Sequence, residues 1–446
     1  MDLSQKRIFV IENSVTSDAC PQYEMNTRLM KINRPNYLSK LISLKGNGMI
    51  KVVTGMRRCG KSFLLYDLFA TELLNQGVER ECIVEVNFES YRDRELRDPD
   101  ALYQYVQSRI SDERTYYLLF DEVQMLKDFE DVLNGFLTMG NVDIYVTGSN
   151  ARFLSKDIAT EFRGRGFEVR MYPLSFSEFM SVYEGSKSAG LKEYMLYGGL
   201  PQIVSYQSEV QKSDYLKALF DETYIRDIQE RYNIRKDDDL KELINILASG
   251  IGSLTNPNNL ANTFRSVKKS SITYDTVSNY VDYLCDSFLI ESASRYDIKG
   301  KKYIASPCKY YFMDLGLRNA RLNFRQTEWT HLMENLVYNE LRMRGLNVDV
   351  GSLPVVRRDD AGVQQRSTLE IDFVCNQGSK RYYVQSAYRL PSEEKVRQEE
   401  APLLAVDDSF KKIVISGEEG PVLRSENGIT TMSIYDFLLN PESLEL

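Results

Sequence analysis

Three hydrophobic stretches in the first half of the chain each end in a polar or glycine-rich segment. The first, MIKVV at 49–53, leads into a glycine-rich loop and then into an amphipathic segment. The second, YYLLF at 116–120, ends in two acidic residues, and the third, VDIYV at 142–146, ends in small polar residues. Short apolar strands that alternate with helical patterns are typical of a parallel sheet with helices on its faces. The pattern predicts an α/β fold, with the polar residues at the carboxyl edge of the sheet.

The glycine-rich loop has the spacing of a phosphate-binding loop. Gly55 begins the pattern G-x-x-x-x-G-K-S, which ends at Ser62 and lies between a strand pattern and a helix pattern. Glycines let backbone N–H groups turn toward phosphate, and the helix N-terminus adds its positive dipole. Lys61 would contact the β- and γ-phosphates of ATP, and the Ser62 hydroxyl would bind Mg²⁺. A chance Gly/Lys loop is the alternative. The residues expected at the nucleotide are Gly55, Met56, Arg57, Arg58, Cys59, Gly60, Lys61, Ser62 and Phe63.

A carboxylate pair follows the second apolar stretch. In TYYLLFDEVQML, Asp121 and Glu122 come directly after a strand pattern. Asp121 would bind the Mg²⁺ ion, and Glu122 would orient and deprotonate the attacking water. Acidic pairs also end ordinary strands, so this pair indicates a nucleotide site only in combination with the glycine-rich loop before it. Together they predict ATP hydrolysis with Mg²⁺ as the metal cofactor.

Polar and basic residues follow the third apolar stretch. Thr147, Ser149 or Asn150 would lie at the nucleotide edge of the sheet, and Asn150 is our candidate for sensing the γ-phosphate. A simple Gly-Ser turn explains them equally well. Arg163 and Arg165 then flank a glycine in a loop pattern that suits a catalytic arginine finger, although a solvated basic loop would look the same.

Length and composition limit the remaining possibilities. At 446 residues the chain has room for about three domains, and its 43% hydrophobic and 27% charged residues are typical of a soluble globular protein. No apolar run reaches the roughly 20 residues of a membrane helix, and the N-terminus lacks the pattern of a signal peptide. We therefore expect a cytoplasmic protein without a membrane partner. The net charge of −8 gives no global attraction to nucleic acid.

Cysteine and histidine usage excludes several kinds of site. The six cysteines form no C-x-x-C pair, which argues against a zinc knuckle and a disulfide framework. His331 is the only histidine, so histidine triads and multi-histidine metal sites are excluded. Cys59 lies inside the glycine-rich loop, next to Arg58 and a helix N-terminus. That positive environment predicts a lowered thiol pKa and a reactive cysteine.

Several motifs together resemble a known family. GMRRCGKS, LLFDE, TGSNARFL, FRGRGFEVRMYPLSFSEF and YMLYGGLPQIV look like the bacterial and archaeal predicted ATPases of the AAA type that carry a C-terminal domain of unknown function. The resemblance runs from about Ile32 almost to the end of the chain. It implies the nucleotide and catalytic roles given above for the loop and the carboxylate pair. It also places the family's arginine at Arg165 rather than Arg163.

The middle of the chain predicts helices and a short hairpin. The stretch LKALFDETYIRDIQERYNI has helical spacing and would close over the nucleotide domain. Three further helical patterns, followed by two strand patterns, indicate a winged helix, which the family resemblance also implies. In the third of these helices Thr273 or Asp275 would form the N-cap, and Val277, Val281 and Leu284 would face the core.

Basic residues beside the third helix are candidates for DNA contact. They are Arg265, Lys268, Lys269, Lys299, Lys301 and Lys302. Such a cluster could neutralise a few phosphates without reading bases, and it could equally be a solvated surface on a domain that contacts protein. DNA contact is the interpretation we favour, and contact with a protein stays open.

The C-terminal region carries acidic residues on a predicted helix and on a predicted strand. Glu334 lies at the border of the apolar side of a helix that ends at Gly345. Asp372 lies on the first strand of a later hairpin, EIDFVCNQGSKRYYVQSAYRL. The order of helix acid, strand acid and second strand resembles the restriction-endonuclease-like fold, to which the family's C-terminal domain is commonly likened.

Whether this region cleaves nucleic acid depends on the faces of the hairpin. Period-two alternation places Leu369, Ile371 and Phe373 on one face of the first strand and Glu370, Asp372 and Val374 on the other. On the second strand it aligns Tyr383, Gln385 and Ala387, and we expect this face to be the one that Glu334 and Asp372 approach. Cleavage needs carboxylates that gather Mg²⁺ and a lysine. Gln385 and Ala387 stand where the further carboxylate and the lysine are needed, so we expect an inactive nuclease-like module.

These inferences combine into four segments and one leading function. The segments are an N-terminal extension (1–31) without an assigned role, an AAA-type P-loop ATPase domain with a helical segment (32–235), a winged-helix domain (236–325) and a nuclease-like domain (326–446). The leading hypothesis is a Mg²⁺-dependent ATPase whose nucleotide state controls the winged helix and the nuclease-like module on DNA, with a homo-oligomer left open. The alternatives are a nucleotide-gated protein-interaction switch with slow hydrolysis and an active nuclease with a migrated site.

Overall fold

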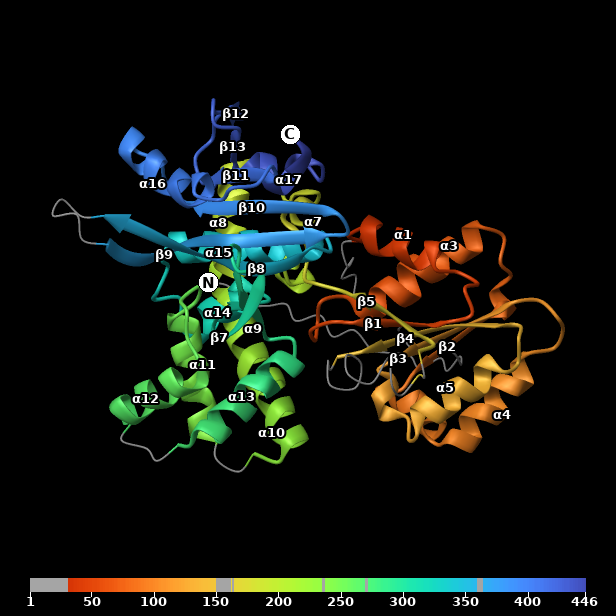
Figure 1. Cartoon of the computed structure of the whole chain (residues 1–446). Helices are drawn as coiled ribbons and strands as arrows, with labels where there is room; N and C mark the ends of the chain where they lie inside the picture. Colours follow the sequence, from red (N-terminus) through yellow and green to blue (C-terminus); the bar gives the residue numbers. More distant parts are fainter. Residues whose placement is uncertain (1–30, 150–161, 163, 235–236, 269–271, 359–363) are drawn as a thin grey trace, which may run out of the picture. The chain divides into compact units, whose positions relative to one another are not determined.

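The residues from Ile50 to Arg170 build a sheet of five parallel strands. The strands are β1 (Ile50–Thr54), β2 (Ile83–Asn87), β3 (Tyr116–Asp121), β4 (Val142–Gly148) and β5 (Gly166–Arg170). Their order is β2-β3-β4-β1-β5, and every neighbouring pair is parallel. The predicted α/β fold is confirmed in the computed structural model of the chain (Figure 1).

The structure describes residues 31–149, 162, 164–234, 237–268, 272–358 and 364–446. Of the predicted N-terminal extension, only Lys31 lies within them. From Ile32 onward the described residues belong to one compact unit. Among these residues, no helix combines the length and the apolar character that a bilayer crossing requires.

Helices cover both faces of the five-stranded sheet. Successive residues of a strand point to opposite faces, so a strand that is apolar throughout has side chains to bury on both sides. Val53 packs in one cluster with Phe69, and Val52 packs in another with Leu102 and Leu133. The helices on the first face are α1 (Pro35–Ser43), α2 (Lys61–Phe63), the π-helical segment η1 (Leu64–Phe69) and α3 (Ala70–Asn75), and those on the second are α4 (Pro99–Arg109) and α5 (Phe129–Leu137). Short 3₁₀ turns are η2 (Arg80–Cys82), η3 (Tyr91–Arg97) and η4 (Val123–Met125).

A helical segment follows the first sheet. It consists of α7 (Phe176–Met180), α8 (Lys187–Tyr197), the 3₁₀ turn η5 (Pro201–Ser205), α9 (Glu209–Ala218), the π-helical segment η6 (Leu219–Ile225) and α10 (Arg226–Tyr232). The last three continue one another without a break, as the helical spacing of residues 216–234 predicts.

Three helices and a hairpin come next in the chain. They are α11 (Asp237–Ser249), α12 (Pro257–Lys268), α13 (Tyr274–Asp286), β6 (Ile290–Asp297) and β7 (Lys302–Phe312). The Thr273 hydroxyl caps α13 by accepting a bond from the Thr276 N–H, and Val277, Val281 and Leu284 are buried, as predicted. β6 also pairs in parallel with a later strand, so the hairpin belongs to a second, larger sheet.

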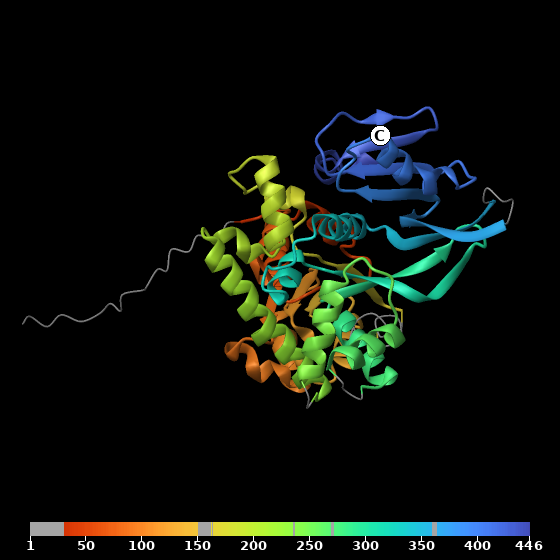
Figure 2. The ribbon, with the colours of Figure 1, turned by 90° about the vertical axis from the view of Figure 1, so that its left-hand side faces the viewer.

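The second sheet has eight strands in the order β12-β13-β11-β10-β9-β8-β6-β7. Its further strands are β8 (Asn347–Arg358), β9 (Gln364–Gln377), β10 (Lys380–Ala387), β11 (Lys411–Ser416), β12 (Leu423–Arg424) and β13 (Ile429–Ser433). The helices of this part are α14 (Leu315–Arg321), α15 (Trp329–Met343), α16 (Glu393–Leu404) and α17 (Ile434–Leu439), with a 3₁₀ turn η7 (Ser443–Glu445). β8, β9 and β10 run beside one another in Figure 1, and Figure 2 shows the same part of the chain, in cyan to blue, after a turn of 90°.

The alternation predicted for β9 is interrupted by a bulge. The register between β8 and β9 shifts between Asp349 and Gly351. Ile371 and Val374 consequently lie in the same hydrophobic cluster, whereas Phe373 packs in the cluster on the other face. The prediction that Ile371 shares a face with Phe373 and not with Val374 was wrong, because one extra residue shifts the two-residue period.

Candidate active site

Two glycines shape the loop between β1 and α2. Gly55 has a φ of +148°, and a Cβ atom there would lie 2.2 Å from the Met171 carbonyl oxygen. Gly60 has a φ of +103°, where a side chain would be strained. Glycine is therefore needed at both positions, and the loop lies close against the segment that follows β5.

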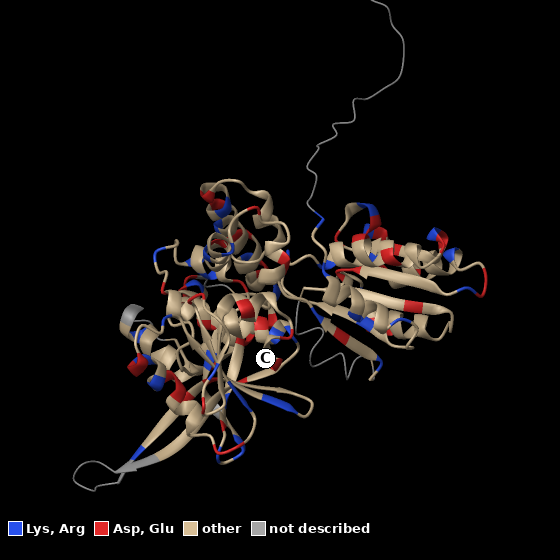
Figure 3. Ribbon diagram, turned by 90° about the horizontal axis from the view of Figure 1, so that it is seen from above, with Lys and Arg blue, Asp and Glu red and all other residues tan. Residues whose placement is uncertain are grey.

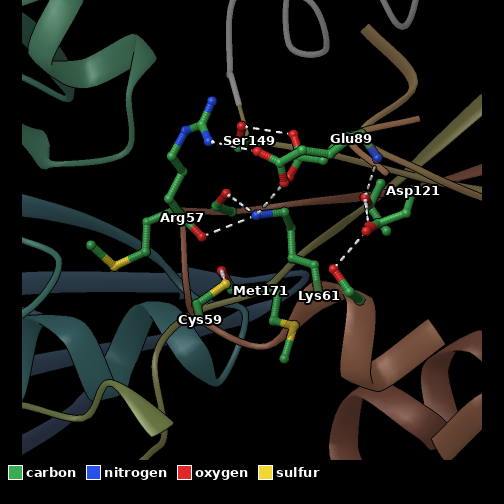
Figure 4. Close-up of polar contacts among 12 residues, drawn as sticks. Arg57, Cys59, Lys61, Glu89, Asp121, Ser149 and Met171 are labelled. Carbon is green, nitrogen blue, oxygen red and sulfur yellow. Dashed lines mark hydrogen bonds and ion pairs between the residues drawn. The ribbon is translucent and has the colours of Figure 1, made fainter. Parts of the chain in front are cut away.

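Lys61 is buried within this loop. Its ammonium donates to the carbonyl oxygens of Gly55 and Met56, both at 3.0 Å, and lies 3.9 Å from the Glu122 carboxylate (Figure 4). Only 4% of the side chain is exposed. Because a buried charge is costly without partners, these carbonyls and the carboxylate hold the ammonium at the N-terminus of α2.

Arg34 supports the loop from outside the predicted motif. Its guanidinium donates to the carbonyl oxygens of Cys59 at 3.2 Å and Tyr172 at 2.8 Å, and its Nε donates to Glu178 at 2.9 Å. The residue is 3% exposed. Arg34 thereby ties the loop to the segment at 172–178. Sequence reasoning missed it, because its partners lie far along the chain and its own neighbours form no motif.

Ser62, at the start of α2, meets Asp121, at the end of β3. The Ser62 hydroxyl donates to Oδ2 of Asp121 at 2.8 Å, and the Thr147 hydroxyl donates to Oδ1 at 2.5 Å. The Thr147 oxygen also accepts the Glu122 N–H at 2.9 Å. Burial raises the pKa of Asp121, and the two hydroxyl bonds oppose that rise. These side chains form one hydrogen-bonded group with Ser62 at its exposed end.

Glu122 directly follows β3 with its backbone in the left-handed region, at a φ of 54°. Its carboxylate accepts a bond from the Ser149 hydroxyl at 2.9 Å and another from the Gln124 amide. Burial acts to raise the pKa of Glu122, but the Lys61 charge and the Gln124 bond outweigh burial and lower it. The carboxylate is therefore ionised and held beside the Lys61 ammonium.

A cavity of about 660 Å³ borders the loop. It is lined by Arg57, Arg58, Gly60, Lys61, Ser62, Phe63, Glu89, Glu122, Glu222, Thr223, Arg226, Asp227 and Glu230. The Tyr224 hydroxyl donates to the Arg57 carbonyl at 2.7 Å, and the Arg57 guanidinium donates to Asp227 at 2.9 Å. The prediction that residues 216–234 close over the nucleotide domain is thus confirmed. Of the residues expected at the nucleotide, Gly55, Met56 and Cys59 do not line this cavity.

Cys59 contradicts the prediction of a reactive thiol. Its exposed fraction is 0%, and its Sγ lies 3.8 Å from the Met171 carbonyl oxygen. Burial raises the pKa of the thiol, and the positive charges of Lys61 and Arg34 do not compensate for it. The prediction was wrong because burial raises the pKa of the thiol more than the neighbouring positive charges lower it.

Arg165 lies at the opposite edge of the sheet from the loop. The next residue, Gly166, pairs with Ile50 at the start of β1, whereas the loop follows Thr54 at the end of that strand. The five residues of β1 separate the two edges by about 16 Å, at roughly 3.3 Å per residue. Arg165 is exposed and is not brought to the cavity of its own chain. The candidates Asn150 and Arg163 lie outside the described residues.

A second polar group surrounds Lys309 of β7 in the C-terminal region. Its ammonium lies 2.8 Å from the carboxylates of both Glu334 and Glu370 and 3.8 Å from Asp372. The Tyr311 hydroxyl also donates to Glu334, at 2.7 Å. Burial raises the pKa of Asp372, and the charge of Glu334 adds to that rise. Sequence reasoning found the acids on α15 and β9 but missed the lysine, which comes from a distant strand.

Gln385 and Ala387 lie on the other face of the second sheet. Ala387 packs in the cluster that includes α16, and the Gln385 amide donates to Glu399 of α16 at 3.2 Å. The neighbouring Val384 points the other way, into the cluster that includes α15, the helix that carries Glu334. The prediction that Gln385 and Ala387 share the face that Glu334 approaches was wrong.

Comparison with protein-family models matches two parts of the chain. Residues 47–180 match an AAA domain, and residues 188–328 match a domain of unknown function. The first match covers all five strands of the parallel sheet and the loop that holds Lys61. The five-stranded parallel sheet and this match together identify an AAA-type P-loop ATPase fold.

Relatives extend this similarity over most of the chain. An uncharacterized protein of Haemophilus influenzae is 34% identical over 414 residues, which are 92% of this chain and 98% of the relative. An uncharacterized protein of Methanocaldococcus jannaschii is 29% identical over 388 residues, which are 83% of each chain. Among solved structures, a Walker-type ATPase of Pyrococcus abyssi is 17% identical and matches with a TM-score of 0.47 over 66% of this chain and 97% of that chain. The chain belongs to the same family as the Haemophilus influenzae protein.

Proposed function

We propose that the protein binds Mg²⁺-ATP in the cavity beside the loop at 55–62 and hydrolyses it. The observation that carries this proposal is the buried Lys61 ammonium, which lies at the N-terminus of α2 and 3.9 Å from Glu122. An ammonium beside a glycine-rich loop at a helix N-terminus suits a polyphosphate. The cavity of about 660 Å³ has the size of a small-molecule site. The match to an AAA domain supports the same function.

Ser62 and Asp121 are the residues that would hold Mg²⁺. Their oxygen atoms lie 2.8 Å apart, and Mg²⁺ prefers oxygen ligands with several retained waters. Thr147 fixes the orientation of the Asp121 carboxylate by donating to its other oxygen. When bound, the ion would neutralise charge on the β- and γ-phosphates.

Glu122 is the residue that we propose to orient and deprotonate the attacking water. Its lowered pKa keeps it in the carboxylate form, which accepts a proton. Ser149 and Gln124 hold that carboxylate in place. Since Arg165 is remote from the cavity of its own chain, a catalytic role for it requires the cavity of a second copy. A homo-oligomer is therefore part of the proposal, and Asn150 stays the candidate for sensing the γ-phosphate.

DNA is the partner that we propose for a winged helix formed by α11, α12, α13 and the β6–β7 hairpin. Arg265 of α12 and three lysines around the hairpin turn, Lys299, Lys301 and Lys302, are exposed. The side chain of Lys268 and the whole of Lys269 lie outside the described residues. A few such contacts neutralise phosphates without reading bases. Because contacts with phosphates are screened by salt and carry no sequence information, we expect salt-sensitive binding of low sequence specificity. Basic and acidic residues are interspersed along the described elements (Figure 3).

The nuclease-like part is proposed to bind or assemble rather than to cleave. Lys309 neutralises Glu334 and Glu370 from within the protein, at 2.8 Å from each carboxylate. A metal ion bound by these carboxylates would have to displace this ammonium, and a buried charge that loses its partners is costly. The lysine therefore occupies the position in which a cation would otherwise balance the acids.

A metal-dependent nuclease is the second candidate for this part, and one observation favours it. Lys309 brings to Glu334 and Asp372 the ammonium that Ala387 cannot provide. A lysine beside acidic residues could steady the attacking water or the phosphate charge. Mg²⁺- or Mn²⁺-dependent nicking of supercoiled DNA, lost in both Asp372→Asn and Lys309→Met, would establish this activity. We expect no nicking by the parent protein.

The experiment that tests the proposed function is ATP turnover by the purified protein. Phosphate release would be measured with Mg²⁺ or EDTA, and without DNA, with single-stranded DNA and with double-stranded DNA. We expect Mg²⁺-dependent release that rises with DNA. Binding of ATP without release would favour the nucleotide-gated interaction switch, and the absence of both binding and release would overturn the proposal.

A further inference from the structure

One continuous helix connects the phosphate loop with α13. Residues 219–232, which form η6 and α10, line the cavity through Glu222, Asp227 and Glu230. The last residue of α10, Tyr232, contacts α13, and these two helices carry neighbouring labels in Figure 1. The helix therefore touches the candidate nucleotide site at one part and α13 of the proposed winged helix at the other.

The contact with the phosphate loop is an ion pair. The Arg57 guanidinium donates to Asp227 at 2.9 Å. It also lies 3.6 Å from Glu89, which follows β2 (Figure 4). Asp227 also accepts a bond from Arg231, one helical turn later, at 2.5 Å. The side chains of Arg57 and Asp227 are 28% and 22% exposed, so both can be reached from the cavity that they line.

The contact with α13 combines stacking and a hydrogen bond. The rings of Tyr232 and Tyr283 are stacked, with 3.7 Å between centroids and 9° between planes. The Tyr232 hydroxyl donates to the Asp286 carboxylate at 3.0 Å, at the end of α13. A movement of α10 therefore displaces side chains that are packed on α13, because packed aromatic rings do not slide freely.

The charges on the two sides of the cavity set up a competition for Arg57. The helix presents the carboxylates of Glu222, Asp227 and Glu230 to the same cavity that a polyphosphate would enter. A bound phosphate would be repelled by these carboxylates and attracted by the arginine that Asp227 holds. A phosphate that draws the Arg57 side chain toward the loop would lengthen its bond to Asp227, so the two anions compete for the position of the guanidinium.

We propose that the Arg57–Asp227 ion pair is a latch that nucleotide opens, and that α10 carries this change to α13 through Tyr232. The proposal rests on the proposed ATP binding, and it adds the route by which occupancy of the loop reaches the winged-helix part. In the closed state, Asp227 holds Arg57 and fixes α10. With nucleotide bound, Arg57 turns to phosphate, and α10 is released from the loop. By linkage, the latch must then weaken ATP binding, since it stabilises the empty state.

Asp227→Asn tests the latch, and Glu230→Gln is its matched control. Both substitutions remove one carboxylate charge from the cavity lining of the same helix. Glu230 pairs with the exposed Arg226 at 2.8 Å, whereas Asp227 pairs with Arg57. Calorimetry should show that Asp227→Asn binds ATP about fivefold more tightly or better than the parent, at the lower end of usual coupling between linked sites. Glu230→Gln, which relieves the same charge repulsion without touching Arg57, should tighten binding by no more than about twofold.

Hydrogen exchange of the backbone amides in α10 and α13 tests whether the change at Arg57 reaches α13. ATP should speed exchange in both helices of the parent, and Asp227→Asn should show the faster exchange without ATP. Tyr232→Ala should keep the response in α10 and lose it in α13. Equal affinity gains in Asp227→Asn and Glu230→Gln would overturn the latch, as would ATP binding by the parent without any response in α10. A parent protein that binds no ATP would instead overturn the proposed function together with the latch.

Discussion

Lys309 on β7 and Glu334 on α15 form a buried ion pair with 2.8 Å between Nζ and Oε1. Lys309→Met should leave the carboxylates without their cation and cost about 3–5 kcal/mol of unfolding free energy, as breaking a buried pair from one side usually does. The double variant Lys309→Met with Glu334→Gln should recover part of that loss, because it removes both charges. Urea unfolding of the parent, of Lys309→Met, of Glu334→Gln and of the double variant measures the cycle. If Lys309→Met were as stable as the parent, the ion pair would not contribute to the stability of the fold.

Asp314 predicts a pH dependence of stability. It is buried at the start of α14 and accepts backbone bonds from Gly199 at 2.8 Å and Leu317 at 2.9 Å. Burial raises its pKa to about 6, above the value of about 3.9 for an aspartate in an unfolded chain. The contribution of Asp314 to the free energy of unfolding is therefore fully present below about pH 4, where the carboxyl is protonated in both states. It is lost as the pH rises through 6.

Asp314→Asn removes this titration while keeping a similar shape. The unfolding free energy of the parent relative to the variant should fall by up to about 3 kcal/mol between pH 4 and pH 7. Urea unfolding at several pH values gives this difference, and the other carboxylates cancel because both proteins contain them. A difference that stays constant over the range would mean that Asp314 does not change its pKa on folding.

The parts of the site that local sequence could predict are those whose partners are set by the topology of the parallel sheet. Ser62 and Asp121 are 59 residues apart, yet they meet because each lies at the carboxyl end of a strand, or just after it, in the same sheet. Strand, loop and helix in that order also position Lys61. These placements follow from short-range patterns and from one general rule of parallel sheets.

The parts that sequence reasoning missed depend on burial and on distant strands. Cys59 has the neighbours of a reactive thiol, but its pKa is decided by complete burial, which the local sequence does not reveal. Arg34 and Lys309 act on partners 25 residues or more away and belong to no motif. Alternation aligned Gln385 with Ala387 correctly, but it could not say which helix covers that face of the sheet.

Cys59 should be protected from alkylation in the folded protein. Its buried thiol has a raised pKa, so little thiolate forms and reagents cannot reach it. Treatment with iodoacetamide followed by peptide mass spectrometry should find Cys59 unmodified, both with and without ATP, and modified after denaturation. Cys59→Ser should still bind ATP. Rapid modification of native Cys59 that nucleotide blocks would contradict the buried geometry.

Arg165 should act only across copies of the chain. Because it lies about 16 Å along the sheet from its own loop, Arg165→Ala should bind ATP normally yet lose turnover, by about 10³-fold in the strongest cases. Arg163→Ala is the matched control and should lose less. Mixing Arg165→Ala with Glu122→Gln should restore some turnover in mixed assemblies. No recovery, with assembly confirmed by sedimentation, would remove Arg165 from the catalytic mechanism.

ATP binding by Lys61→Ala, compared with Glu122→Gln, tests the central claim most directly. Lys61 is proposed to contact the phosphates, whereas Glu122 is needed only for the attacking water, so the two substitutions should separate binding from turnover. Calorimetry with Mg²⁺-ATP should detect binding by the parent and by Glu122→Gln and no binding by Lys61→Ala, and phosphate release should be lost in both variants. Equal ATP affinity of Lys61→Ala and the parent would contradict the assignment of the loop at 55–62 as the nucleotide site.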